Sequence, residues 1–147
     1  MNGQANSPWF QRANAFLEEN RDNQDGKWHT VNFLVQRNYC CINNRVSIEE
    51  ILQYLNTNGI DIGREAFQQT ILGELKRDGI VATLVYPGPR GGVFIPSSED
   101  EVREVTSQVL ERIDSETRNL SGITTNTSFS NLISLLSQII SWIKNNL

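Results

Sequence analysis

The sequence is poor in the residue types that build metal centres and disulfide frameworks. Its 147 residues include one His and two Cys. A structural zinc site usually takes four Cys or His ligands, so we expect no metal centre. Cys40 and Cys41 are adjacent, and a disulfide between sequence neighbours is strained. We therefore expect two free thiols that pack as small core residues in a reducing compartment.

Long apolar runs are also missing. No stretch of about 18 uninterrupted apolar residues occurs, which argues against a polytopic membrane protein. The first ten residues show no basic region followed by an apolar core, so they do not fit a secretory signal. With 38% hydrophobic residues, the sequence predicts a cytoplasmic protein with one small domain and an accessory element.

Catalytic patterns are scarce as well. His29 is the single imidazole and has no nucleophile at a diagnostic spacing, because a lone Cys40 makes a weak dyad. The acidic residues at 49–50 and 99–101 fit helix starts better than acid–base catalysis. The segment PGPRGG at 87–92 lacks the Lys-Ser/Thr ending of a phosphate-binding loop. We therefore expect no enzyme and no cofactor.

Charge is distributed unevenly along the chain. Residues 1–98 hold nine basic and ten acidic side chains, residues 99–120 hold three and seven, and Lys144 alone is charged after that. The net charge of -4 thus arises mostly from one segment. Nucleic-acid binding remains open, because the local field on one face decides it. Nonspecific coating of nucleic acid is disfavoured.

The N-terminal third predicts helices. Ser7 followed by Pro8 is typical of a helix start, and apolar residues recur at helical spacing until about Asn20. The polar stretch 20–27 predicts a loop. Residues 28–42 fit a helix or a strand, and we favour a helix because the run is long and lacks turn residues.

Two further helices follow, separated by a short turn. Within residues 46–59, Ser47 and Glu50 form a capping-box pattern, and Asn58-Gly59 is a stop signal. The next helix is predicted over 64–79, with Asp61 as a candidate cap. Its apolar side is predicted to consist of Phe67, Ile71, Leu72 and Leu75.

After these helices, two extended runs surround a Pro/Gly turn. Residues 80–86 and 93–96 flank PGPRGG, which predicts a β-hairpin. In this order the stretch 46–96 resembles a winged helix domain: VSIEEILQYL resembles the first motif helix, GREAFQQTILGELKRDGIV the second, and PGPRGGVFIP the wing. The step ELKRDGIV resembles the common winged-helix ending, in which the recognition helix closes on Gly and the first wing strand begins. The return strand GGVFIP followed by an acidic helix is similar to small regulators of bacteria and phages.

This resemblance implies a mainly α fold with a small β-hairpin (α+β). The winged helix-turn-helix core would carry an additional N-terminal helix and C-terminal helices. It also implies a transcriptional or plasmid/phage regulator that binds duplex DNA, with the second motif helix in the major groove and the wing on the backbone or minor groove. Winged helices also serve as protein-interaction or scaffold modules, so that alternative stays open.

Candidate DNA contacts lie opposite the apolar side of the second motif helix. Gln can pair with adenine and Arg with guanine, whereas Lys and Arg suit phosphates. The candidates are Arg64, Gln68, Gln69, Thr70, Lys76, Arg77 and, at the hairpin tip, Arg90. The same residues also fit an ordinary solvated face. Gly73 is expected on this outward side, explained either by close approach of a backbone or by packing.

The C-terminal segments predict an accessory element. An acidic helix over 99–120, capped by Ser97-Ser98, is followed by a polar linker and an apolar helix over 129–147. One seam of that helix is Phe129, Ile133, Leu136, Ile140, Ile143 and Leu147; an adjacent seam is Leu132, Leu135, Ile139 and Trp142. So wide an apolar face must be buried by the chain's own core, a second subunit or a membrane surface. We favour self-association through the first seam, because few phosphate contacts are available per monomer.

These observations suggest a division of the chain into five parts. They are residues 1–27 (N-terminal helix and loop), 28–98 (winged-helix domain), 99–120 (acidic helix), 121–128 (linker) and 129–147 (amphipathic oligomerisation helix).

Overall fold

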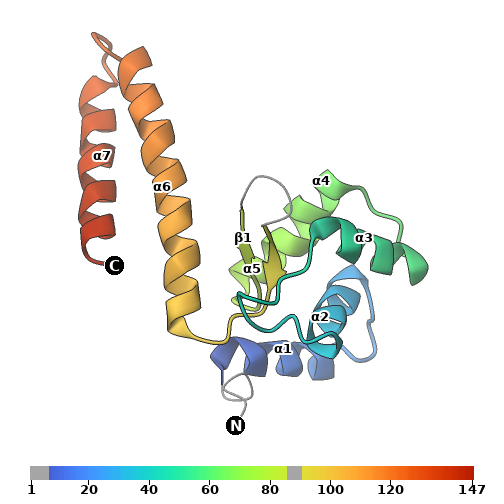
Figure 1. Ribbon diagram of the computed structural model, residues 1–147. Helices are drawn as coiled ribbons and strands as arrows, with labels where there is room; N and C mark the ends of the chain where they lie inside the picture. Colours follow the sequence, from blue (N-terminus) through green and yellow to red (C-terminus); the bar gives the residue numbers. More distant parts are fainter. Residues whose placement is uncertain (1–6, 86–90) are drawn as a thin grey trace. The chain divides into compact units, whose positions relative to one another are not determined.

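The computed structural model describes residues 7–85 and 91–147. The chain divides into two compact units, Met1–Val102 and Arg103–Leu147, which are described separately. Figure 1 shows helices throughout both units and one hairpin in the first. The predicted mainly α fold with a small β-hairpin is confirmed.

The first helix, α1 (Pro8–Glu19), begins as the sequence predicted. The Ser7 hydroxyl accepts a hydrogen bond from the Phe10 amide at 3.0 Å, and it donates to the Pro96 carbonyl at 2.8 Å. A single buried side chain thus caps α1 and joins it to the segment after the hairpin. Ala13, fully buried, brings the helix into the core of the first unit.

The second helix, α2 (Gly26–Gln36), differs from the prediction at both ends. It starts before residue 28 because the Asp25 carboxylate accepts from the Trp28 amide at 3.0 Å. It ends before residue 42 because Asn38 adopts a left-handed conformation with φ of 59°. Residues 39–42 are not helical, and the Tyr39 carbonyl accepts from the Ile95 amide at 2.9 Å. The helical prediction for residues 39–42 was therefore wrong.

The next helix, α3 (Ile48–Thr57), confirms the predicted cap, because the Ser47 hydroxyl accepts from the Glu50 amide at 3.2 Å. The second motif helix is a continuous rod made of α4 (Arg64–Ala66), η2 (Phe67–Leu72) and α5 (Gly73–Arg77). We call Arg64–Arg77 the motif helix. Its N-cap is Gly63 with no side-chain cap, so the prediction of Asp61 as cap was wrong.

The hairpin consists of β1 (Ala82–Leu84) and β2 (Gly92–Phe94), paired antiparallel with Thr83 opposite Val93. This confirms the predicted hairpin. An additional bridge joins Val46 to Val93 on the far side of β2, with hydrogen bonds of 2.8 and 3.0 Å. Gly92 permits this approach, because a Cβ there would lie 2.9 Å from the Val46 carbonyl oxygen.

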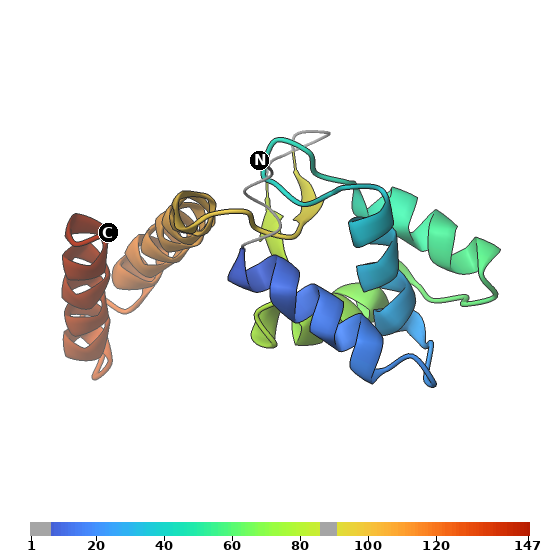
Figure 2. The same cartoon turned by 90° about the horizontal axis from the view of Figure 1, so that it is seen from below.

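The core of the first unit is formed around α2. Figure 2 shows α1 and α3 on either side of it, and α2 also contacts η2. The largest fully buried apolar side chains come from α2, α3, the motif helix and the hairpin region: Phe67, Phe94, Leu34, Ile51, Leu55, Leu75, Ile95, Val31, Val46 and Val93. The apolar side of the motif helix is therefore packed against the other elements of the unit.

The C-terminal part contains α6 (Glu99–Ile123) and α7 (Ser130–Asn145). The predicted capping of α6 by Ser97-Ser98 is confirmed. The Glu101 carboxylate accepts hydrogen bonds from the Ser97 amide and hydroxyl, each at 2.8 Å. The helix continues three residues past the predicted end at Leu120, into the predicted linker. Among the described residues, no helix is both long enough and apolar enough to cross a bilayer.

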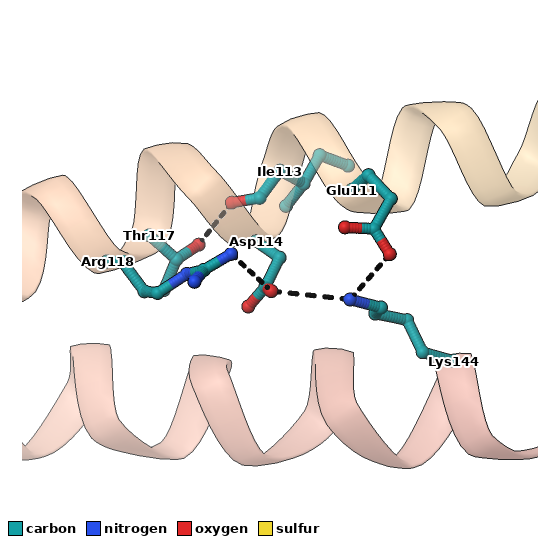
Figure 3. A network of polar contacts seen from close by, with 6 residues as sticks. All are labelled: Glu111, Ile113, Asp114, Thr117, Arg118 and Lys144. Atoms are coloured by element: carbon teal, nitrogen blue, oxygen red, sulfur yellow. Dashed lines mark hydrogen bonds and ion pairs between the residues drawn. The ribbon is translucent and has the colours of Figure 1, made fainter.

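Polar contacts hold α6 and α7 together as an antiparallel hairpin (Figure 3). The Lys144 ammonium lies 2.8 Å from the Glu111 carboxylate and 3.4 Å from that of Asp114. Asp114 also accepts from Arg118 at 3.1 Å. The hydrogen bond to Glu111 raises the pKa of Lys144, so this ammonium stays charged throughout the neutral range.

Candidate nucleic-acid interface

The motif helix is amphipathic in the way its sequence predicted. Phe67, Ile71, Leu72 and Leu75 are all buried, which confirms the predicted inward side. Gly26 of α2 faces Ile71 so closely that a Cβ on Gly26 would lie 2.6 Å from the Ile71 Cδ1. The rod is thus pressed against α2, and this contact fixes which side points outward.

The outward side carries the candidate contact residues. Six of the seven predicted residues are exposed in the structure: Arg64, Gln68, Gln69, Thr70, Lys76 and Arg77. They come from all three sections of the rod, so their shared outward orientation depends on how the helix turns through these sections. The seventh, Arg90, lies outside the described residues.

The middle of the rod is a π-helix. The Gly73 amide donates to the Gln68 carbonyl, five residues earlier, and the Thr70 hydroxyl donates to the Ala66 carbonyl at 2.6 Å. The wider turn alters the helical register, and Gly73 is buried, so its predicted place on the outward side was wrong. A Cβ at Gly73 would lie 3.3 Å from the Gln68 carbonyl and 3.4 Å from the Arg77 guanidinium. The atoms nearest to Gly73 therefore belong to its own helix, which favours the packing explanation over close approach of another backbone.

Carboxylates moderate the charge of the outward side. Arg64 forms an ion pair with Glu49 of α3. The Gln69 side-chain NH2 group donates to the Glu65 carboxylate at 3.2 Å. The Gln69 side-chain carbonyl oxygen takes no part in that hydrogen bond. These contacts orient the side chains at the start of the rod while lowering its positive field.

One ion pair of the motif helix comes from a distant segment. Lys27 of α2 lies 3.0 Å from the Glu74 carboxylate, and hydrogen bonding to Glu74 raises the pKa of Lys27. Lys27 could not be identified from the sequence, because nothing local signals a partner 47 residues away. Residues 64–78 hold three basic and three acidic side chains, so Lys27 adds positive charge beside a neutral helix.

The predicted oligomerisation seam is divided by the structure. Ile140 is buried, Ile133 and Ile143 are half-buried, and Phe129, Leu136 and Leu147 are exposed. The adjacent seam is exposed throughout, at Leu132, Leu135, Ile139 and Trp142. Part of the first seam therefore lies between α6 and α7, whereas the second faces outward.

Metal-ligating side chains do not cluster in the part of the chain that the structure describes. No group of three or more His, Cys, Asp or Glu side chains is placed to hold a metal ion there. Cys40 and Cys41 are free thiols.

This chain is similar in sequence to a curated archaeal protein. Neither a protein-family model nor a solved structure matches it. A protein of Methanocaldococcus jannaschii, named "Putative control protein C.MjaVP", is 42% identical over 146 residues, which cover 95% of this chain and 89% of the relative. Identity of this degree over nearly the full length means that this chain belongs to the same family as C.MjaVP.

Proposed function

We propose that this protein is a regulator that binds double-stranded DNA through the outward side of the motif helix. The observation that carries the proposal is a helix firmly anchored on one side that presents amides and cations on the other. The name of the relative, which describes a control protein, supports a regulatory role.

The side chains of the outward side divide by chemistry. Gln68 and Gln69 carry the amides that can pair with adenine in the major groove, and Arg64 carries a fork suited to guanine or phosphate. Lys76 and Arg77 at the end of the rod suit phosphates. The Thr70 hydroxyl already donates to the Ala66 carbonyl, so its methyl group and remaining oxygen lone pair serve contact with thymine or a donor. Arg90 in the hairpin turn is proposed for the backbone or the narrow minor groove.

Affinity in this proposal depends on two copies. The motif helix has no net charge over residues 64–78, so each copy supplies few phosphate contacts. A dimer doubles these contacts and lets two motif helices enter successive major grooves.

Binding is tested by fluorescence anisotropy with a random-sequence duplex, titrated with salt from about 20 mM upward. Wild type should bind at low salt, and Lys76→Ala with Arg77→Ala should flatten the salt slope by about two units. Gln53→Ala is the matched control, because Gln53 is an exposed amide on α3 rather than on the motif helix. Absence of binding even at the lowest salt would contradict the proposal.

Base readout needs a second measurement. Selection from a random duplex pool should enrich a common sequence for wild type, and Gln68→Ala or Gln69→Ala should relax preference at one position while leaving the salt slope unchanged. The interaction-module alternative predicts no enriched sequence and no salt-dependent binding.

A further inference from the structure

The α6–α7 hairpin has one apolar side that its own two helices leave uncovered. On α6 the exposed residues are Val109, Ile113 and Leu120, and on α7 they are Leu132, Leu135, Leu136, Ile139 and Trp142. We call these eight residues the outer face. Their exposed fractions run from 37% for Val109 to 67% for Trp142.

Helix geometry places both stripes on the same side of the hairpin. At about 100° per residue, the α6 stripe lies about 70° from the side that carries buried Leu110 and Thr117. The α7 stripe lies about 100° from the side that carries buried Ile140. Because the two helices run antiparallel, these rotations lead to one common side. By the same geometry, Lys144 and its partners Glu111 and Asp114 lie on the other side of the buried residues.

We propose that the outer face binds the same face of a second copy of this chain and completes a four-helix bundle. Two antiparallel helices with a joint apolar side are half of such a bundle. An isologous contact requires a patch that complements itself, and Leu, Ile, Val and Trp side chains, interrupted on α6 by Glu116, meet that requirement.

The size of the face fits a dimer. With about half of each side chain exposed, the eight residues offer on the order of 700 Å² of apolar surface. A stable dimer buries about 800 Å² on each partner, so the outer face and its edge supply most of what is needed. Ile123, Phe129 and Leu147 are also exposed and add to this edge.

The chemistry of the face favours a second copy over other occupants. By helix position, Glu116 is the one charged side chain within its α6 stripe, and homodimer interfaces are more apolar than other interfaces. Within the described residues of the first unit, Val85 is the one large hydrophobic residue with comparable exposure. The described part of that unit therefore presents no apolar face of similar size. The proposed DNA function would also use a dimer, although the test below does not depend on DNA.

The test compares two neighbouring positions of α7 in the full-length chain. Ile139 lies on the outer face, whereas Gln138 is exposed on the polar side of the same helix. Ile139→Glu would bury an unpaired carboxylate in the dimer, and Gln138→Glu adds the same charge to a solvated side. Analytical ultracentrifugation from about 1 to 100 μM should give twice the monomer mass for wild type and Gln138→Glu, and at least a tenfold weaker dimer for Ile139→Glu.

Two controls keep the outcome decisive. Circular dichroism verifies that each variant retains wild-type helix content, and Trp142→Ala, which adds no charge, should weaken the dimer in the same direction. A monomeric wild type over the whole range, or an unweakened dimer of both Ile139→Glu and Trp142→Ala, would overturn the interface. So would a monomer whose Trp emission shifts to the blue on neutral phosphatidylcholine vesicles, because the face would then bind lipid.

The result is separable from the result for DNA. A monomer that binds duplex would remove the outer-face interface alone, whereas a dimer that binds no duplex would remove the DNA proposal alone.

Discussion

Arg12 of α1 reaches the end of the motif helix, where its guanidinium donates to the Gly79 carbonyl at 3.0 Å. Gly79 follows the helix in a left-handed conformation with φ of 73°, and a Cβ there would lie 2.8 Å from the Arg12 Nη1. The N-terminal helix thus satisfies a backbone carbonyl at the point where the chain turns from the motif helix into the hairpin.

Replacing Gly79 by Ala should destabilise the protein by about 1–2 kcal/mol, because an L side chain is strained in this conformation and also displaces Arg12. Urea unfolding measures the change. In an Arg12→Ala background the displacement is gone, so the added cost of Gly79→Ala should be smaller than in wild type. A larger added cost would contradict this account.

Ser7→Ala should cost more stability than Ser47→Ala, although both remove a helix N-cap. Loss of a cap alone costs about 1 kcal/mol. Ser7 also donates to the Pro96 carbonyl in a buried setting, and leaving that acceptor unpaired adds about 1–2 kcal/mol. Thermal or urea unfolding of the two variants compares them directly, and equal costs would show that the bond to Pro96 contributes nothing.

Glu49→Gln should strengthen binding to duplex DNA, by about three- to tenfold at low salt if one more cation becomes available. The reason is that Glu49 pairs with Arg64 at the start of the motif helix. Glu18→Gln is the control, because it opens a similarly exposed pair between Glu18 of α1 and Arg21, just past that helix, and changes net charge equally. Equal gains for both variants would indicate that net charge, rather than the release of Arg64, governs affinity.

Cys40 should resist alkylation in the folded protein. Burial, with a smaller contribution from Cys41, raises the pKa of Cys40 to about 11 from the ordinary 9.0. The thiol is therefore protonated at neutral pH and unreactive. Mass spectrometry after iodoacetamide treatment at about pH 8 should find Cys40 modified only once the protein unfolds. Rapid modification of Cys40 in the native state would contradict its burial.

The same shift gives a pH dependence of stability. Between pH 9 and about 11 the folded state keeps the Cys40 proton, whereas the unfolded state loses it. The stabilising contribution is complete below pH 9 and declines above it, by at most about 1.4 kcal/mol per pH unit. Cys40→Ala should flatten this decline in urea unfolding, although its overall stability is lower.

Local signals were sufficient for the helix starts and the hairpin. Ser7 and Ser47 accept the hydrogen bonds that their positions predicted, and the β-branched runs around the Pro/Gly turn form β1 and β2. These features depend on residues a few positions apart, so periodicity and capping chemistry reveal them. The end of α2 was missed because Asn, rather than Gly, takes the left-handed position there.

Long-range features could not be read from the sequence. The bridge between Val46 and Val93 and the ion pair between Lys27 and Glu74 join segments that are 47 residues apart in each case. The two seams of α7 are equally apolar, so periodicity alone could not decide which of them packs on α6. The exposed positions on the motif helix were predicted, but their partners Glu49 and Glu65 were not.

The π-helical segment of the motif helix implies a tolerance to chain length that substitutions would not reveal. The hydrogen bond from the Gly73 amide to the Gln68 carbonyl closes a turn with one more residue than an α-helical turn. Loss of one residue within Phe67–Leu72 would restore an α-helical turn and leave the sections on either side close to their present orientation. Loss of one residue in α5 would instead rotate everything downstream of it by about 100°. Relatives that lack one residue in the π-helical segment can therefore keep the same side of the motif helix turned outward.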